Sequence, residues 1–112
     1  MNIQVEDHGK VCIISPQGDI SVGEGDVALR ESVQVQTERG CSRIVLNLEG
    51  VRYMDSAGIG ELVACLKRVR EAGGDLKVCS VNQRVSDAFH ALQLVKILGI
   101  YKDSEEAIAS FV

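Results

Sequence analysis

A nearly continuous apolar run of strand length constrains the fold of this chain more than any other feature. The run is Ile44-Val45-Leu46-Asn47-Leu48, and it does not alternate regularly between apolar and polar residues. A strand of this kind is buried on both faces, which is typical of a parallel or mixed sheet covered by helices. Aromatic residues make up only 4% of the chain and Trp is absent, so the core has to be aliphatic, as in such sheets. The run therefore predicts an α/β protein.

Strands and helices alternate on both sides of this run. Before it, the pattern predicts strands over 3–7 and 11–17 and a helix of weaker periodicity over 22–38. The helix that follows it is the clearest, with apolar residues at helical spacing over 59–69 and Gly73-Gly74 as its stop. The remaining predictions are a strand over 76–81, a helix over 85–92, a strand over 96–101 and a final helix that Asp103 caps. The predicted order is β-β-α-β-α-β-α-β-α.

Length, charge and hydropathy exclude several classes of protein. The chain has 112 residues without a linker-like tract, so we expect a single domain over residues 1–112. Its formal net charge of −4 argues against a nucleic-acid-binding surface. No apolar run approaches the roughly 20 residues of a membrane span, and the N-terminus carries no signal-peptide pattern. We therefore expect a cytoplasmic protein that binds neither nucleic acid nor membrane.

The four cysteines carry no signature of a metal site. Cys12 and Cys79 lie in strand-like runs, Cys65 lies in a helical one, and no C-x-x-C pair occurs. Free cysteines usually act as small buried apolar side chains. A zinc site would need paired ligands at short spacing, and neither histidine stands near a second one. We therefore expect no metal and no cofactor.

The residues with chemical potential are concentrated over 51–60, between the central strand and the clearest helix. In an open α/β sheet, ligands and partners usually dock at the loop that leaves the carboxyl end of a central strand. Ser56 falls at the predicted helix start, close to backbone N–H groups that have no partner within the helix. Asp55 or Ser56 could serve only as the helix N-cap. The spacing alone leaves the structural and the functional interpretation open.

Two glycines at this helix start favour a functional role. Gly58 and Gly60 both fall in the first helical turns, where each costs roughly 1 kcal/mol relative to Ala. Such a cost indicates that another backbone approaches closely. A phosphate on Ser56 would lie at a helix N-terminus, which is a natural anion site. Phosphorylation would therefore add negative charge to an outward-facing loop without disturbing the fold.

At this point the sequence resembles a known family. Residues 44–48, followed by Tyr53-Met54-Asp55-Ser56-Ala57-Gly58-Ile59-Gly60, closely resemble the central motif of anti-sigma-factor antagonists of the STAS family. The resemblance continues through 73–78 and 94–107, and Gly18-Asp19-Ile20 matches the family's turn of glycine, acid and apolar residue. It implies the STAS fold, a mixed four- to five-stranded β-sheet packed with about four α-helices.

The resemblance implies a bacterial regulator of transcription that switches partners, and not an enzyme. Unphosphorylated, such a protein binds an anti-sigma factor with serine kinase activity and so releases a sigma factor. Phosphorylation, here at Ser56, turns it off, and a serine phosphatase acting on phospho-Ser56 restores it. ATP and magnesium would belong to the kinase. The implied partner-binding residues are Gly18, Asp19, Ser21, Asp55, Ser56, Ala57, Gly58 and Gly60.

One position departs from the family pattern. The family often carries Asp directly after the turn of glycine, acid and apolar residue, close to the phosphorylated serine, and this chain has Ser21 there. Ser21 is able to cap the first helix. It supplies no carboxylate, so the substitution bears on the efficiency of phosphorylation and on the choice of kinase.

Three other functions compete with this one. The sequence from Gly23 to Ala28 satisfies the dinucleotide pattern G-x-G-x-x-A, but Glu24 and Asp26 would place negative charge against a pyrophosphate. A hydrolase with Ser56 as nucleophile lacks the G-x-S-x-G elbow and a positioned base. A STAS scaffold or regulatory subunit of another signalling complex differs only in its partner, so the sequence leaves that alternative open.

Overall fold

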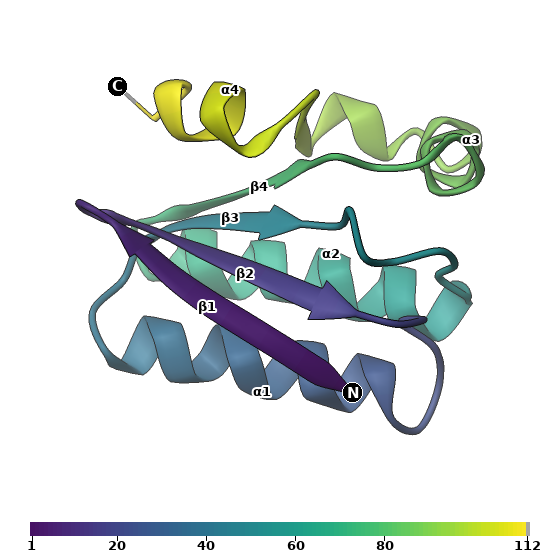
Figure 1. The fold of residues 1–112 in the computed structure, drawn as a ribbon, viewed down its shortest axis with the longest axis horizontal. Coiled ribbons are helices and arrows are strands. Elements are labelled where there is room, and N and C mark those ends of the chain that lie inside the picture. Colours follow the sequence, from purple (N-terminus) through teal and green to yellow (C-terminus); the bar gives the residue numbers. More distant parts are fainter. Residues whose placement is uncertain (112) are drawn as a thin grey trace.

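Five strands form one mixed sheet in the computed structural model, which describes residues 1–111 (Figure 1). β1 pairs antiparallel with β2, and every later neighbouring pair is parallel. The predicted mixed sheet is confirmed. The last residue of the predicted single domain, Val112, lies outside the described residues. In spatial order the strands are β1 (Asn2–His8), β2 (Val11–Gln17), β3 (Arg43–Asn47), β4 (Asp75–Cys79) and β5 (Gly99–Tyr101).

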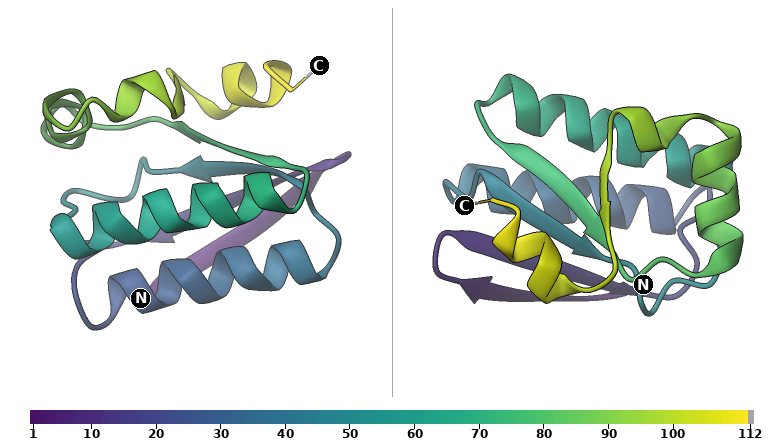
Figure 2. Two further views of the ribbon diagram at one scale, coloured as in Figure 1. Left: turned by 180° about the vertical axis from the view of Figure 1, so that it is seen from behind. Right: turned by 90° about the horizontal axis from the view of Figure 1, so that it is seen from above.

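Helices cover both faces of this sheet. α1 and α2 lie side by side on one face, α4 lies on the other, and α3 stands across the end where the parallel strands finish (Figures 1 and 2). The prediction of about four helices is confirmed. Within residues 1–111, no helix combines the length and the apolar composition that crossing a bilayer requires. The helices are α1 (Gly25–Glu38), α2 (Ser56–Glu71), α3 (Gln83–Ala91) and α4 (Ser104–Ala109), with a short 3-10 helix, η1 (Leu94–Lys96), before β5.

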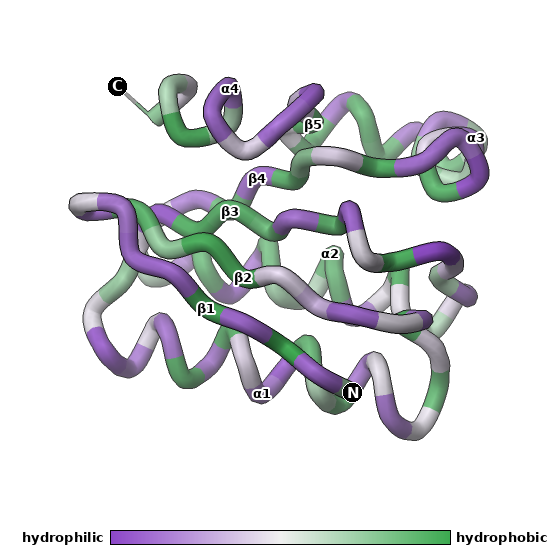
Figure 3. The backbone as a smooth tube through the Cα atoms, in the orientation of Figure 1, coloured by the Kyte–Doolittle hydropathy of each residue, from purple (hydrophilic) through white to green (hydrophobic). Residues whose placement is uncertain are grey.

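The central apolar run forms β3 and contributes to a core on each face of the sheet. Successive side chains of a strand point to opposite faces. Ile44 and Leu46 accordingly pack in the core under α1 and α2, whereas Val45 packs in the core under α4, and all three are fully buried. Figure 3 shows hydrophobic stretches in β2 and β3, while the outermost strand, β1, is mostly hydrophilic. The predicted burial of this strand on both faces is confirmed.

Three boundaries differ from the sequence prediction. The helix expected from residue 22 begins at Gly25, with Glu24 at the N-cap position and no side-chain cap, so Ser21 does not cap it. The strand expected over 76–81 ends at Cys79, before Ser80 adopts a left-handed conformation with φ of 60°. The strand expected over 96–101 is shorter because η1 occupies the start of that segment. Each difference arises from a local turn that hydrophobic periodicity does not encode.

The predicted cap of the last helix, α4, is confirmed. Asp103 accepts a hydrogen bond from the Glu106 backbone N–H at 2.9 Å, so it caps α4 as expected.

The cysteines are all free, and Cys12, Cys65 and Cys79 are buried. Burial raises the pKa of the Cys65 thiol to about 12, which is the behaviour of an inert apolar side chain. Cys41 is the half-buried member of the set.

Candidate functional site

Two loops are joined at the carboxyl ends of β2 and β3. We call them the 18–24 loop and the 48–55 loop. The Ile20 backbone N–H donates to the Tyr53 carbonyl at 3.0 Å, and the Asp55 N–H donates to the Ile20 carbonyl at 3.3 Å. Ile20 also lies in an isolated parallel bridge with the 48–55 loop. The turn of glycine, acid and apolar residue is therefore held beside the segment that leads into α2.

Asp55 fixes the start of α2 and ties it to the other loop. Its Oδ1 accepts from the Gly58 N–H at 2.9 Å, and its Oδ2 accepts from the Val22 N–H at 3.0 Å. The bond from Gly58, followed by that from Val22, lowers the pKa of the Asp55 carboxyl because both bonds favour its charged form. One carboxylate thus caps the helix and anchors the 18–24 loop. Of the two N-cap candidates in the sequence, Asp55 is the cap.

Ser56 is the first residue of α2 and is exposed. Within residues 1–111 its hydroxyl has no hydrogen-bond partner, so no internal contact competes for the oxygen. The residue stands at the N-terminus of a helix of 16 residues. The partial positive charge of that end favours a negative group such as a phosphate. The position is therefore accessible to a modifying enzyme and electrostatically tolerant of the product.

Gly58 and Gly60, in the first turns of α2, differ in whether internal packing requires glycine. Gly58 is buried, and a Cβ there would collide with the carbonyl of Ile20. The close backbone approach expected at Gly58 is thus confirmed, and the approaching backbone is the chain's own 18–24 loop. Gly60 is exposed, and a Cβ there would meet no atom within 4 Å. The internal packing therefore requires glycine at position 58 and does not require it at position 60.

The structure places all eight predicted site residues on the joined loops and the first two turns of α2. Most of them lie at the surface, where a partner can reach them, and Gly58 is the one that is buried. The exposed residues are Gly18, Asp19, Ser56 and Gly60, and the half-buried residues are Ser21, Asp55 and Ala57.

Sequence reasoning missed an arginine-rich rim beside these residues. Asp19, Arg52, Tyr53 and Arg84 line a shallow pocket of about 340 Å³. The Arg84 guanidinium lies 4.5 Å from the centre of the Tyr53 ring, and Arg52 lies 4.0 Å from the Asp19 carboxylate. Arg84 comes from α3, so no local motif could have connected it with Tyr53.

Val22 adds an apolar contact point to the same surface. The residue is 72% exposed, although its backbone N–H donates to the Asp55 carboxylate. Tyr53, across the joined loops, is 36% exposed. Tyrosine is among the residues that most often anchor protein partners, and an exposed valine beside it adds apolar area.

The dinucleotide pattern from Gly23 to Ala28, at the start of α1, does not form a phosphate cradle. The Asp26 carboxylate accepts from the Gly23 N–H at 2.9 Å and from the Val27 N–H at 2.8 Å, which are groups that a phosphate would use. A Cβ on Gly25 would lie 2.5 Å from the Asp19 carbonyl oxygen, so this glycine serves internal packing. The geometry therefore argues against the dinucleotide-binding alternative.

Fold and site together define a STAS domain. Residues 2–107 match the STAS domain family, and the chain belongs to that family. The chain is 30% identical over 108 residues to the anti-sigma F factor antagonist of Paenibacillus polymyxa, which covers 96% of this chain and 92% of the relative. The predicted family and the predicted STAS fold are confirmed.

Solved structures agree with this assignment. TM1081 of Thermotoga maritima, a candidate anti-sigma factor antagonist, superposes with a TM-score of 0.89 at 25% identity, over 96% of this chain and 92% of that one. The Bacillus cell fate determinant SpoIIAA, solved in its phosphorylated form, superposes with a TM-score of 0.75 at 18% identity. That match covers 99% of this chain and 100% of SpoIIAA.

Proposed function

We propose that this chain, as a single STAS domain over residues 1–112, is an anti-sigma-factor antagonist that phosphorylation at Ser56 turns off. The observation that carries the proposal is the position of Ser56. It is the exposed first residue of α2, directly after the Asp55 cap that ties the two loops together. SpoIIAA, which shares this fold, was solved in a phosphorylated form. A protein with this fold can therefore carry a phosphate.

The proposed cycle takes place in the cytoplasm between three proteins. Unphosphorylated protein binds an anti-sigma factor with serine kinase activity, and the sigma factor held by that anti-sigma factor is released. The kinase then transfers a phosphoryl group from ATP, with magnesium, to the Ser56 oxygen. A serine phosphatase removes it. This chain is the substrate of both enzymes and performs no catalysis itself.

The proposed contact surface explains why a single phosphate would be decisive. It combines the exposed residues of the 18–24 loop with Ser56, Ala57 and Gly60, and Val22 and Tyr53 supply apolar area. A phosphate adds nearly two negative charges at the centre of this surface. Burying an unpaired charge in an interface costs several kcal/mol after relaxation. Since 1.4 kcal/mol corresponds to a tenfold change in affinity, binding should weaken at least roughly a hundredfold.

Phosphate mapping tests the modified residue. Incubated with its kinase, ATP and magnesium, the wild-type protein should gain one phosphate on Ser56, and the Ser56→Ala variant should gain none. Mass spectrometry of proteolytic fragments gives the position. Reproducible phosphate on Ser21 or Ser86 in place of Ser56 would refute the assignment.

Calorimetric titration against the anti-sigma factor tests the switch. Wild type and Ser56→Ala should bind equally well, because the substitution removes one hydroxyl and adds no charge. The phosphorylated form should bind at least roughly a hundredfold more weakly. Gly60→Leu should lose binding by steric exclusion while keeping its fold, since no internal atom lies near that Cβ position. Equal affinity of the phosphorylated and unphosphorylated forms would show that Ser56 is not the switch.

A pull-down with wild type and Ser56→Ala identifies the partner class. Mass spectrometry of the captured proteins should find a histidine-kinase-type ATPase. Capture of a different signalling complex, with no kinase in it, would instead support a STAS scaffold or regulatory subunit.

A further inference from the structure

The first turn of α3 is fastened to the 48–55 loop by one side chain. Asn82 caps α3 through its Oδ1, which accepts from the Val85 N–H at 2.8 Å, while its Nδ2 donates to the Arg52 carbonyl at 3.0 Å. Val85 and Phe89 are buried in the core, so they hold the rest of the helix in place. The start of α3 therefore has a fixed position beside the loop.

This attachment places Arg84 over Tyr53. The Arg84 guanidinium lies 4.5 Å from the centre of the Tyr53 ring. A cation over a ring face is attracted by the electrons of the ring, which leaves most of the hydrogen-bonding capacity of a guanidinium free. Arg84 is exposed, and within residues 1–111 its side chain forms neither an ion pair nor a hydrogen bond. The guanidinium is thus positioned but unpaired.

The other charged walls of the shallow pocket around Arg84 face each other. This pocket, which we call the Arg84 pocket, is lined by Asp19, Arg52, Tyr53 and Arg84. Arg52 lies 4.0 Å from the Asp19 carboxylate. Two arginines and one aspartate leave the lining with an excess of one positive charge, and the unpaired member is Arg84.

We infer that the Arg84 pocket receives a carboxylate side chain of the anti-sigma factor, and that Arg84 is a specificity-determining residue of this chain. The inference rests on the proposed function, since it adds the chemistry of the partner to the same contact surface. Arginine and tyrosine are two of the residue types that contribute most to binding at protein interfaces. Because Tyr53 already belongs to the contact surface, the pocket extends that surface from the 48–55 loop onto α3.

The charge and geometry of the pocket favour a carboxylate. A guanidinium and a carboxylate can form two parallel hydrogen bonds, and one excess positive charge matches one negative charge. A phosphate would bring nearly two negative charges next to the Asp19 carboxylate. The contact with Tyr53 already restricts the Arg84 side chain, so little of its freedom remains to be lost on binding. A carboxylate at position 84 would instead repel the same partner, which is how charge gives specificity.

Calorimetric titration against the anti-sigma factor recovered in the pull-down tests the inference. Arg84→Gln should bind about tenfold more weakly than the wild type, and Arg84→Glu about a hundredfold more weakly. Arg84→Lys retains the charge but loses the paired donors, so its affinity should fall between those of the wild type and Arg84→Gln. Affinity of the wild type should decrease with salt concentration, and that of Arg84→Gln should decrease less. A role confined to holding Tyr53 in place would leave the salt dependence unchanged.

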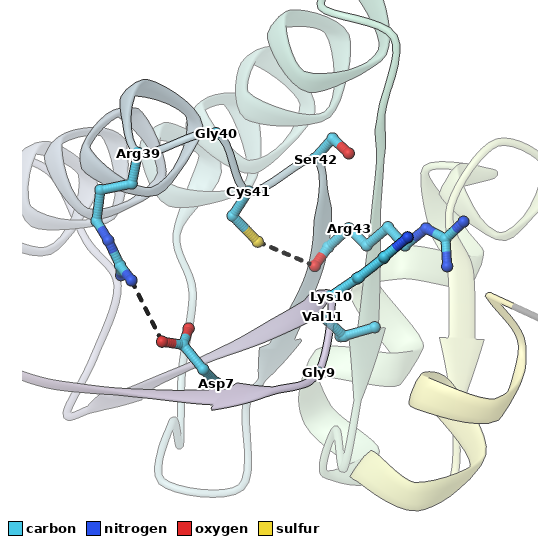
Figure 4. A pocket seen from close by; sticks show the side chains of 9 residues that line it. All are labelled: Asp7, Gly9, Lys10, Val11, Arg39, Gly40, Cys41, Ser42 and Arg43. Atoms are coloured by element: carbon cyan, nitrogen blue, oxygen red, sulfur yellow. Dashed lines mark hydrogen bonds and ion pairs between the residues drawn. The ribbon is translucent and has the colours of Figure 1, made fainter.

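Lys10→Glu is the matched control. It makes the same change of charge in the turn between β1 and β2, at the opposite end of the sheet, where Figure 4 shows the Lys10 side chain. Its affinity should remain within about twofold of the wild type, because salt screens charges at such a separation. Melting curves establish that each variant is folded. If Arg84→Glu failed to fold, Arg84→Gln and Arg84→Lys would still give the comparison.

Failure of this inference can be told apart from failure of the proposed function. If the wild type captured no anti-sigma factor, both would fall together. If the wild type bound the anti-sigma factor and phosphate on Ser56 released it, but Arg84→Glu bound as tightly as the wild type, only the role of Arg84 would be overturned. Equal losses in Arg84→Glu and Lys10→Glu, or the same salt dependence in Arg84→Gln and the wild type, would overturn it as well.

Discussion

The two ends of the sheet are built on different principles. At the carboxyl end, backbone hydrogen bonds and the Asp55 carboxylate join the 18–24 and 48–55 loops into one surface. At the amino end, the turn before β2 and the connection from α1 to β3 leave a cavity, bridged at its edge by the exposed Arg39–Asp7 ion pair. Exposed ion pairs contribute little to stability, whereas a backbone network fixes a shape. The carboxyl end therefore has a fixed shape, whereas the edge of the amino end is held less firmly.

Both ends nevertheless contain glycines that the packing requires. At the carboxyl end, a Cβ on Gly58 would collide with the Ile20 carbonyl. At the amino end, a Cβ on Gly74 would collide with the carbonyl of Ser42, which also accepts a hydrogen bond from the Asp75 N–H at 2.9 Å. The comparison teaches that close backbone packing at an end of the sheet does not by itself determine what that end binds.

The largest loss of stability is expected from Gly58→Ala. The added methyl group would force the 18–24 loop away from α2, and overpacking of this kind costs about 3 kcal/mol or more against backbone. Denaturant unfolding should show the loss. Gly60→Ala, two residues along the same helix, is the control, and it should raise stability by up to about 1 kcal/mol. If both variants were equally stable, the contact between the two loops would not constrain the fold.

The next largest effect is expected of Asp55→Ala, which removes the helix cap and the anchor of the 18–24 loop together. The melting temperature should fall by several degrees near neutral pH. The folded-state pKa of Asp55 is lowered, so its contribution is present above the unfolded-state value and is lost as pH falls. The gap between wild type and variant should therefore close below about pH 4. If the difference in melting temperature between wild type and variant did not change with pH, the charged form of Asp55 would contribute no more to stability than the neutral form.

A smaller effect is expected of Ser56→Asp. A negative charge at the first position of α2 is tolerated or mildly favourable, by about 0.5 kcal/mol. Circular dichroism should show a folded protein with a melting temperature close to that of the wild type. An unfolded variant would indicate that this position is a structural cap and not a site for added charge.

The smallest effect is expected at the amino end, from Asp7→Ala. The ion pair with Arg39 joins two exposed side chains, so its loss should change stability by about 0.5 kcal/mol or less. Thermal unfolding beside the Asp55→Ala variant makes the comparison between the two ends direct. A loss as large as that at Asp55 would show that the two ends are held equally firmly.

Much of this architecture could be predicted because its signals are local. The apolar run of β3, the periodicity of α2 and the Asp55-Ser56 pair lie within contiguous stretches of chain. The start of α1 could not be predicted, because it depends on how Gly25 packs against the backbone of Asp19 and Ile20. Neither could the 3-10 helix, which follows a left-handed residue at Gln93.

The residues of the site could be predicted from the sequence, but their arrangement into one surface could not. Sequence motifs identified Gly18 and Ser56, yet the hydrogen bonds that bring their loops together join residues more than thirty positions apart. The stacking of Arg84 on Tyr53 likewise joins residues more than thirty positions apart. Contacts of this range depend on the register of the parallel strands, which no single segment encodes.

The joining of the two loops also bears on how such a protein can evolve. The bonds from the Gly18 N–H to the Gly50 carbonyl and from the Ile20 N–H to the Tyr53 carbonyl are made by backbone atoms alone. Side chains facing outward from this frame can therefore change freely, whereas an inserted or deleted residue in either loop would shift every bond beyond it. Divergence among duplicated copies should consequently proceed by substitution at fixed loop length. Copies of one ancestor could then acquire different partners in a single cell while keeping superposable backbones.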